Sequence, residues 1–103
     1  RFSVAEVDGV PAGALLLKGN YVDHLWVRPE FMGQGVGSAL LDHAVDRAAR
    51  AGFERLTLDC LALNEKALAF YRAKGFTVER AYVATNYLAG EDVRLMTKEL
   101  STG

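Results

Sequence analysis

The chain has 103 residues and a mass of 11.2 kDa, and half of its residues are hydrophobic, so we expect one compact domain with a single core. Twelve basic and thirteen acidic residues give a net charge of −1, which excludes a global positive field for binding nucleic acid or an anionic membrane. No run approaches the roughly 20 apolar residues that span a bilayer, and the one cysteine, Cys60, excludes an intrachain disulfide and fits a reducing cytosol.

Three antiparallel strands are expected at the start of the chain. Phe2–Val7 and Val10–Lys18 are rich in β-branched and apolar residues, and Asp8-Gly9 between them is a hairpin-turn signal. After a second turn that contains glycine, Tyr21–Val27 is the third strand candidate. Pro29 ends it, because proline cannot continue the hydrogen-bond ladder.

The most regular helical pattern covers Gly35–Ala51, where apolar residues recur at helical spacing. The apolar set is Val36, Leu40, Leu41, Ala44, Val45 and Ala48. Gly52 ends this helix, and Phe53–Leu61 then alternates apolar and polar residues like a strand with one buried face. Strand, helix and strand with short connections form a βαβ unit, so we expect Tyr21–Val27 and Phe53–Leu61 to run parallel through a right-handed crossover.

A second helix is expected between Asn64, a natural N-cap, and Gly75, a C-terminal stop. The tail returns to strands at Phe76–Val83 and Asp92–Leu100. The turn residues Asn86 and Gly90 indicate a loop over Ala84–Glu91 that joins an antiparallel pair. The fold class is therefore α/β (α+β), with two helices on a mixed, mainly antiparallel twisted sheet that contains a central βαβ unit.

Three glycines, Gly33, Gly35 and Gly37, stand at alternate positions between the third strand and the first helix. A helix N-terminus presents N–H groups without partners and a partial positive charge, so it binds phosphate by hydrogen bonds and dipole together. The glycines alone leave two interpretations open, an anion site and a tight strand-to-helix turn. Their spacing differs from the G-x-G-x-x-G dinucleotide fingerprint, and no lysine follows them as a P-loop requires.

The segment Val27–Leu41, with the sequence VRPEFMGQGVGSALL, resembles the acyl-CoA-binding motif of the GNAT superfamily of N-acetyltransferases. A second segment is similar to the family pattern N-x-x-A-x-x-F-Y-x-x-x-G-F, and its matching residues are Asn64, Ala67, Phe70, Tyr71, Gly75 and Phe76. The two matches together span Leu25–Phe76, about half of the chain.

The resemblance implies that acetyl-CoA is a co-substrate, that no metal takes part, and that an amine attacks the thioester directly without a covalent enzyme intermediate. The implied cofactor-binding residues are Leu25, Trp26 and Val27 along the pantetheine arm, the amides of Gln34, Gly35, Val36, Gly37 and Ser38 around the pyrophosphate, and Asn64 and Tyr71. An amide near Val27 would polarise the thioester carbonyl. Tyr71 matches the residue that protonates the departing thiolate.

One position departs from the family pattern, since Met32 stands where Arg or Gln is usual. We expect the loop to keep its fold and to lose some affinity for pyrophosphate. Purely structural roles also fit several of the residues above. Tyr71 fits a core aromatic, Asn64 fits an N-cap, and Cys60 fits a small buried hydrophobe better than a nucleophile.

The base that accepts the amine proton has three candidates on or near the third strand, Asp23, His24 and Glu30. His24 shares a strand face with Trp26 and titrates near neutrality, which suits the task, although a surface histidine fits the pattern equally. Further candidates for contact with the nucleotide phosphates are Arg28, Arg72 and Lys74.

The sequence as a whole predicts a single cytoplasmic acetyltransferase domain over residues 1–103, which moves an acetyl group from acetyl-CoA to a primary amine in a ternary complex. The acceptor is a small molecule or a peptide, with no nucleic acid or membrane partner, and exposed sheet edges favour a homodimer. The family usually carries a strand and two helices ahead of the point where this sequence begins. We therefore expect either a longer protein or a minimal variant that a partner chain completes.

Two other functions stay open at this stage. A non-catalytic acyl-CoA-binding or regulatory module would keep the phosphate loop without productive acceptor binding. A nucleotide-phosphate binder would use the loop without coenzyme A, but it leaves Asn64 and Tyr71 unexplained.

Overall fold

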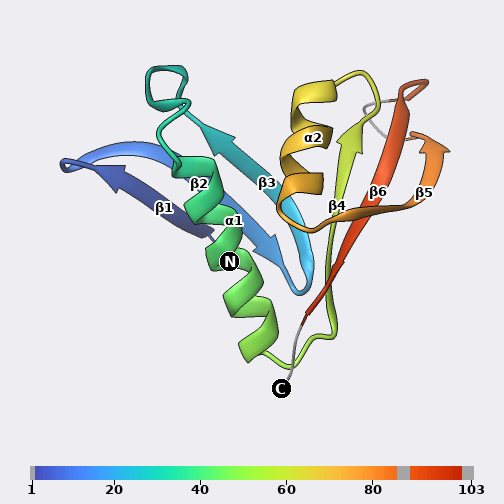
Figure 1. Ribbon diagram of the computed structural model, residues 1–103, viewed down its shortest axis with the longest axis horizontal. Coiled ribbons are helices and arrows are strands. Elements are labelled where there is room, and N and C mark those ends of the chain that lie inside the picture. The colour runs from blue at the N-terminus through green and yellow to red at the C-terminus, as the bar shows by residue number, and fades with distance from the viewer. Residues whose placement is uncertain (1, 86–88, 101–103) are drawn as a thin grey trace. The chain divides into compact units, whose positions relative to one another are not determined.

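The structure is a computed structural model that describes residues 2–85 and 89–100, so the predicted turn residue Asn86 lies outside the described residues. The chain order is β1 (Phe2–Val7), β2 (Val10–Lys18), β3 (Tyr21–Val27), a 3-10 turn (Pro29–Phe31), α1 (Val36–Arg50), β4 (Arg55–Leu61), α2 (Glu65–Ala73), β5 (Thr77–Val83) and β6 (Asp92–Glu99) (Figure 1). The strand order in the sheet is β1-β2-β3-β4-β6-β5. The predicted mixed α+β class is confirmed.

The described residues fall into two compact units, residues 2–56 with residue 100 and residues 57–85 with 89–99. The pairs β1–β2 and β2–β3 are antiparallel in the first unit, and β5–β6 is antiparallel in the second. The predicted antiparallel start and tail are therefore confirmed. The parallel direction expected for β3 and β4 stays a prediction.

In the first unit, the β1–β2 hairpin turns at Asp8 and Gly9, whose φ angles of 52° and 80° suit a two-residue hairpin turn. The ladder between β2 and β3 contains a bulge in β3. Leu16 pairs with His24 and Leu17 pairs with Val22, which leaves Asp23 as the extra residue. Side chains alternate across a strand, so the bulge resets which of them share a face of β3.

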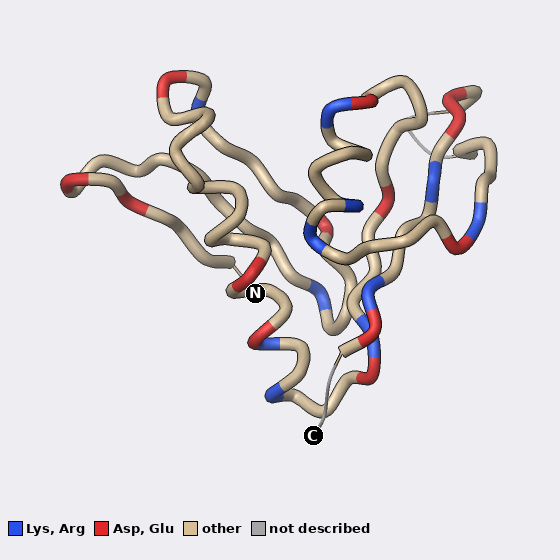
Figure 2. The backbone as a smooth tube through the Cα atoms, viewed as in Figure 1, with Lys and Arg blue, Asp and Glu red and all other residues tan. Residues whose placement is uncertain are grey.

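Helix α1 packs in the first unit through the apolar stripe predicted from the sequence. The buried residues are Val36, Leu40, Leu41, Ala44 and Ala48, while Val45 is only partly buried. Acidic and basic positions are interleaved along the C-terminal half of the helix (Figure 2), where Arg50 Nε lies 2.9 Å from the Asp46 carboxylate. The helix thus separates a core face from a charged face.

Gly13 of β2 lets α1 approach the sheet closely. A Cβ at this position would lie 2.6 Å from the carbonyl oxygen of Trp26, 3.0 Å from Leu40 Cδ1 and 3.1 Å from Val36 Cγ1. Val36 and Leu40 belong to the first turns of α1, so the absent side chain fixes where the N-terminus of this helix sits against β2 and β3.

Both α-helices end in the same glycine-based motif, in which the glycine is left-handed and the amide of the next residue bonds to the carbonyl five positions back. After α1, the amides of Gly52 and Phe53 donate to the carbonyls of Ala49 and Ala48, at 3.0 and 3.1 Å. Because the Phe53 amide bonds back to the helix, β4 begins at Arg55 rather than at the predicted Phe53. For the same reason, β5 begins at Thr77 and not at Phe76.

The core of the second unit is built from the inward face of β4 and from residues that follow α2. Leu58 and Cys60 are buried on β4, and Phe76, Val93 and Met96 of the same unit are buried as well. Lys98 of β6 donates from Nζ to the carbonyl of Lys74 at 2.6 Å, which places a cation at the C-terminus of α2.

We predict that Gly13→Ala lowers the free energy of unfolding by about 1–3 kcal/mol, because the added methyl overpacks the contact between β2 and α1. Urea denaturation followed by circular dichroism measures the change. Ala14→Val is the matched control, since it adds bulk at the next position of the strand, on the opposite face. Equal stability of Gly13→Ala and the wild type would contradict the close approach.

Candidate active site

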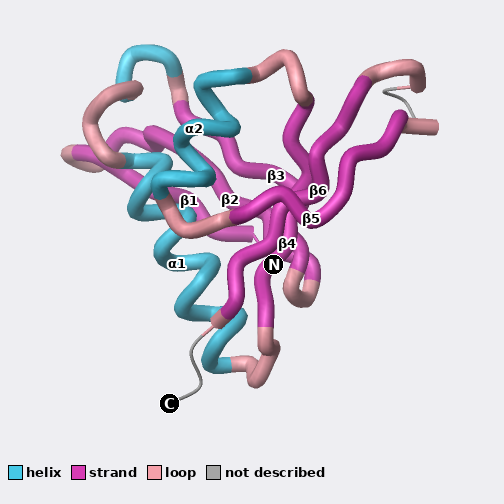
Figure 3. The backbone as a smooth tube through the Cα atoms, turned by 45° about the vertical axis from the view of Figure 1, so that its right-hand side comes forward, coloured by secondary structure: helices cyan, strands magenta, loops and turns pink. Residues whose placement is uncertain are grey.

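The connection from β3 to α1 contains the predicted phosphate loop. Figure 3 shows a short helical turn followed by a loop that leads into α1. The turn is closed by the Phe31 amide, which donates to Arg28 O at 2.9 Å, and by the Met32 amide, which donates to Pro29 O at 3.2 Å. Gly33 and Gly35 both have left-handed backbones, with φ of 79° and 83°. The sequence prediction of glycine-dependent backbone geometry here is confirmed for these two glycines.

Gly35 is the N-cap of α1, and as a glycine it has no side chain to satisfy the first amides of the helix. The first intrahelical bond runs from the Ala39 amide to Gly35 O at 3.0 Å. The amides of Val36 and Gly37 come before that bond and have no acceptor further back in the helix. Such amides, together with the helix dipole, attract an anion.

Side chains brace the same loop from within the first unit. Arg28 donates from Nη2 to the Glu30 carboxylate at 2.9 Å and from Nη1 to Pro11 O at 3.3 Å. Gln34 donates from Nε2 to the Glu30 carbonyl at 3.3 Å. Met32, at the position that departs from the family pattern, is 65% exposed.

Strand β3 carries the residues expected along the pantetheine arm. Trp26 is 56% exposed, whereas Leu25 and Val27 are partly buried. His24 is exposed like Trp26, two positions away, as the predicted shared face requires. His24 Nε2 lies 3.5 Å from the Asp23 carboxylate, which also lies 3.5 Å from Lys18 Nζ.

Glu30 differs from the other two candidate bases because its carboxylate is already paired. The pKa of Glu30 is lowered, chiefly by a hydrogen bond from its own backbone amide and further by the Arg28 guanidinium. A carboxylate with a lowered pKa is a weaker base, so Glu30 is the least suited of the three candidates.

Asn64 and Tyr71 belong to the second unit and lie on α2. Asn64 is the predicted N-cap, and its side-chain oxygen accepts from the Ala67 amide at 3.2 Å. This bond fixes the side chain of the residue that the family resemblance assigns to coenzyme contact. The structural role predicted for Asn64 is therefore confirmed.

Tyr71 is held by the end of α2. The Phe76 amide donates to Tyr71 O at 3.0 Å, and the Gly75 amide donates to Arg72 O at 3.0 Å. The rings of Tyr71 and Phe76 meet edge to face with centroids 6.0 Å apart. The ring centroids of Phe70 and Tyr71 lie 5.3 Å apart in a tilted arrangement. The spacing F-Y-x-x-x-G-F thus has a local cause, since glycine and phenylalanine close the helix onto the tyrosine ring.

Burial raises the pKa of the Tyr71 phenol above its ordinary value of 10.0, and the neighbouring Cys60 raises it further. Burial also raises the pKa of the Cys60 thiol, which lies on the inward face of β4. A buried thiol of raised pKa is a poor nucleophile, as the sequence predicted. Tyr71 in turn keeps its proton at neutral pH and can serve as a hydrogen-bond donor.

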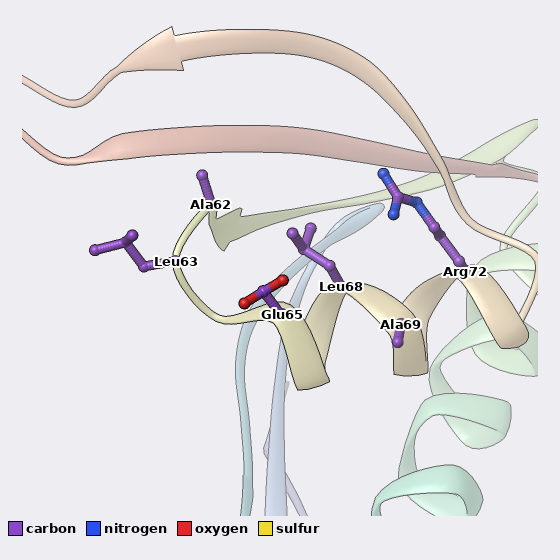
Figure 4. A pocket seen from close by; sticks show the side chains of 6 residues that line it. All are labelled: Ala62, Leu63, Glu65, Leu68, Ala69 and Arg72. Carbon is purple, nitrogen blue, oxygen red and sulfur yellow. The ribbon is translucent and has the colours of Figure 1, made fainter.

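A cavity of about 320 Å³ lies in the second unit, along α2 and the loop that precedes it (Figure 4). Its lining residues are Ala62, Leu63, Glu65, Leu68, Ala69 and Arg72. Leu68 and Arg72 project from the same side of α2, and neither Asn64 nor Tyr71 lines the cavity. The nucleotide-phosphate role considered for Arg72 stays a prediction.

The predicted site residues are divided between the two compact units. Residues 34–38, at the start of α1, belong to the first unit together with β3, and Asn64 and Tyr71 belong to the second unit at the N-cap and in the last turn of α2. Sequence reasoning missed the pairing of Arg28 with Glu30 and the bond from Gln34 to the Glu30 carbonyl. The short spacing of opposite charges at positions 28 and 30 was the available signal.

Within residues 2–85 and 89–100, no group of three or more His, Cys, Asp or Glu side chains could hold a metal ion. Among the same residues, no helix is long and apolar enough to cross a membrane.

Comparison with known proteins identifies the family. The model of the acetyltransferase (GNAT) family matches residues 1–76. The peptidyl-lysine N-acetyltransferase YjaB of Escherichia coli strain K12 is 38% identical over 68 residues, which are 66% of this chain and 43% of that protein. The chain therefore belongs to the acetyltransferase (GNAT) family, and it spans less than half the length of this curated relative.

Solved structures share the fold. A GCN5-related N-acetyltransferase from Rhodopseudomonas palustris superposes with a TM-score of 0.84 at 27% identity, over 96% of this chain and 61% of that one. A protein of Bacillus anthracis in complex with acetyl coenzyme A gives a TM-score of 0.88 at 20% identity, over 97% of this chain and 62% of that one.

The raised pKa of Tyr71 predicts a loss of stability at alkaline pH. The unfolded chain releases this proton near pH 10.0 and the folded chain releases it only at higher pH. The contribution of Tyr71 to stability is therefore complete below the unfolded pKa and falls as the pH rises through the folded pKa. Urea unfolding between about pH 9 and 11 should show a shallower loss in Tyr71→Phe than in the wild type. Parallel losses in the two proteins would contradict the burial of the phenol.

Proposed function

We propose that this chain forms an acetyltransferase domain that moves an acetyl group from acetyl-CoA to a primary amine in a ternary complex. The observation that carries the proposal is the left-handed glycine N-cap of α1, which leaves the amides of Val36 and Gly37 without intrahelical acceptors at the end of the connection from β3. Membership of the acetyltransferase (GNAT) family supports acyl transfer as the chemistry.

Coenzyme binding is assigned to backbone more than to side chains. The amides from Gln34 to Ser38 bind the pyrophosphate through hydrogen bonds and the helix dipole. The backbone of Leu25, Trp26 and Val27 lies along the pantetheine arm, where an amide near Val27 polarises the thioester carbonyl. Asn64 contacts the coenzyme arm while it caps α2. The acetyl-CoA complex of the Bacillus anthracis protein, which shares the fold, supports acetyl-CoA as the co-substrate.

The proposed reaction forms one bond and breaks one. The amine nitrogen attacks the thioester carbonyl carbon, the carbon–sulfur bond breaks, and coenzyme A leaves as a thiolate. The Tyr71 phenol donates a hydrogen bond to that sulfur and passes its proton to it. Because burial raises the pKa of Tyr71, the phenol is protonated at neutral pH before the reaction. After the transfer it regains a proton from solvent.

The proton lost by the amine goes to His24 in this proposal. The imidazole is exposed and so exchanges protons with water, and its Nε2 lies 3.5 Å from the Asp23 carboxylate. Glu30 is less suited to this role because its carboxylate is already paired with Arg28.

The acceptor is proposed to be a peptide or small-molecule amine. The relative that acts on peptidyl lysine supports an amine carried by a peptide. We also propose a cytoplasmic location, in keeping with the single free cysteine, and a homodimer formed through an exposed sheet edge.

Gly35→Glu is expected to weaken acetyl-CoA binding by more than tenfold, because it places bulk and negative charge in the anion site. Isothermal titration calorimetry measures the affinity. Gly52→Glu is the matched control, since Gly52 also has a left-handed φ of 90° and open space at its Cβ position, but lies at the other end of α1. Both variants share the backbone strain of about 1–2 kcal/mol. Equal affinity of the two variants would refute the anion site.

Tyr71→Phe is expected to lower kcat at least tenfold while the dissociation constant of acetyl-CoA changes by less than about threefold, because the phenol acts on the departing sulfur. A peptide containing lysine serves as acceptor, and thiol release is followed. Tyr82→Phe is the control, since Tyr82 also has a raised pKa but donates to Asp59 instead. An unchanged kcat in Tyr71→Phe would remove Tyr71 from the mechanism, and binding without any turnover would favour a non-catalytic coenzyme module.

A further inference from the structure

The loop before α1 is anchored at one residue, Glu30, by two separate hydrogen bonds. The Glu30 carboxylate accepts from Arg28 Nη2 at 2.9 Å, and the Glu30 backbone carbonyl accepts from Gln34 Nε2 at 3.3 Å. Arg28 is itself fixed, because its amide donates to Ala12 O at 2.8 Å and its Nη1 donates to Pro11 O at 3.3 Å. A chain of contacts therefore runs from β2 through Arg28 and Glu30 to Gln34, which directly precedes the N-cap of α1.

We propose that Glu30 is a positioning residue, which transmits the fixed position of Arg28 to the phosphate loop and so sets the affinity for acetyl-CoA. The inference rests on the proposed coenzyme site. It assigns no contact with the coenzyme to Glu30, which acts through the backbone of the loop.

The loop needs such an anchor for two reasons. Gly33 and Gly35 hold left-handed conformations, and glycine loses more conformational freedom on ordering than any other residue. Met32, at 65% exposure, is mostly in solvent, so it adds little packing to the segment. Contacts that order the loop before the ligand arrives lower the entropy that binding must remove.

The ionisation state of Glu30 agrees with this role. A hydrogen bond from its own amide and the nearby Arg28 guanidinium lower the pKa of the carboxyl, so the carboxylate is charged at neutral pH. Figure 2 shows the pair as one basic and one acidic position on the connection between β3 and α1.

The opposite assignment for the same residues makes Arg28 a direct phosphate ligand that Glu30 holds back. The two assignments predict opposite changes in acetyl-CoA affinity when the Glu30 charge is removed. If Arg28 binds phosphate, removal of the Glu30 charge frees the guanidinium and strengthens binding. If Glu30 anchors the loop, its removal weakens binding, even though the variant protein is one unit more positive toward an anionic ligand.

The test compares Glu30→Gln with Asp46→Asn by calorimetric titration of acetyl-CoA. Asp46 is a matched control, because its carboxylate also accepts from an arginine at 2.9 Å on an exposed surface and its neutralisation changes the net charge equally. Glu30→Gln should weaken binding three- to tenfold and raise the KM for acetyl-CoA in proportion, with the KM for the amine unchanged. Asp46→Asn should bind like the wild type.

A second variant tests the other contact of Glu30. Gln34→Leu keeps a side chain of similar size without a donor, so it should also weaken binding. Because both contacts fix one segment, the double variant Glu30→Gln with Gln34→Leu should lose less than the product of the two single fold-changes. Thermal unfolding of all variants checks that the fold is retained, as expected for exposed pairs.

Tighter binding or unchanged binding by Glu30→Gln relative to Asp46→Asn would overturn the positioning role. Multiplicative losses in the double variant would also overturn it, since they would mean that the two contacts act independently. Failure of the wild-type protein to bind acetyl-CoA is a different outcome, because it refutes the proposed function itself and the inference with it.

Discussion

The left-handed glycine at the start of α1 is the constraint on which the account of this protein depends. Gly35, at φ 83°, turns the chain from the loop into the helix and leaves the first helical amides without a side-chain cap. Gly13 removes the side chain that would keep those first turns away from β2. Two glycines far apart in the sequence thus shape the N-terminus of α1. Gly35 leaves its first amides without a side-chain cap, and Gly13 fixes the position of the helix against β2.

Tyr71 depends on a comparable arrangement in the second unit. The helix-ending bonds of Gly75 and Phe76 return the chain onto the last turn of α2, so that the Phe76 ring meets the tyrosine edge to face. Asn64 fixes the other end of the same short helix through its bond to the Ala67 amide. The residues proposed to act on the coenzyme arm and on the sulfur are therefore held at the two ends of α2, and Tyr71 also packs against the buried Phe76 ring.

Local patterns in the sequence predicted most of the fold. The apolar spacing predicted α1, the Asp8-Gly9 pair predicted the first hairpin, and Asn64 predicted the start of α2. The starts of β4 and β5 were misplaced by one or two residues, because Phe53 and Phe76 look like strand residues but bond back to a helix end. The bulge at Asp23 and the anchoring of Glu30 by Arg28 depend on partners in space, so periodicity does not reveal them. The roles of the site residues come from the resemblance to a family and not from spacing.

The central claim is that the N-terminal amides of α1 bind the coenzyme. The most direct test is a titration of ¹⁵N-labelled protein with acetyl-CoA, followed amide by amide in NMR spectra, with NAD as the control ligand. The account predicts that the largest saturable shifts occur at Gly35, Val36 and Gly37, and that NAD leaves these amides unchanged. Saturable binding of acetyl-CoA that shifts other amides and leaves these three unmoved would contradict it.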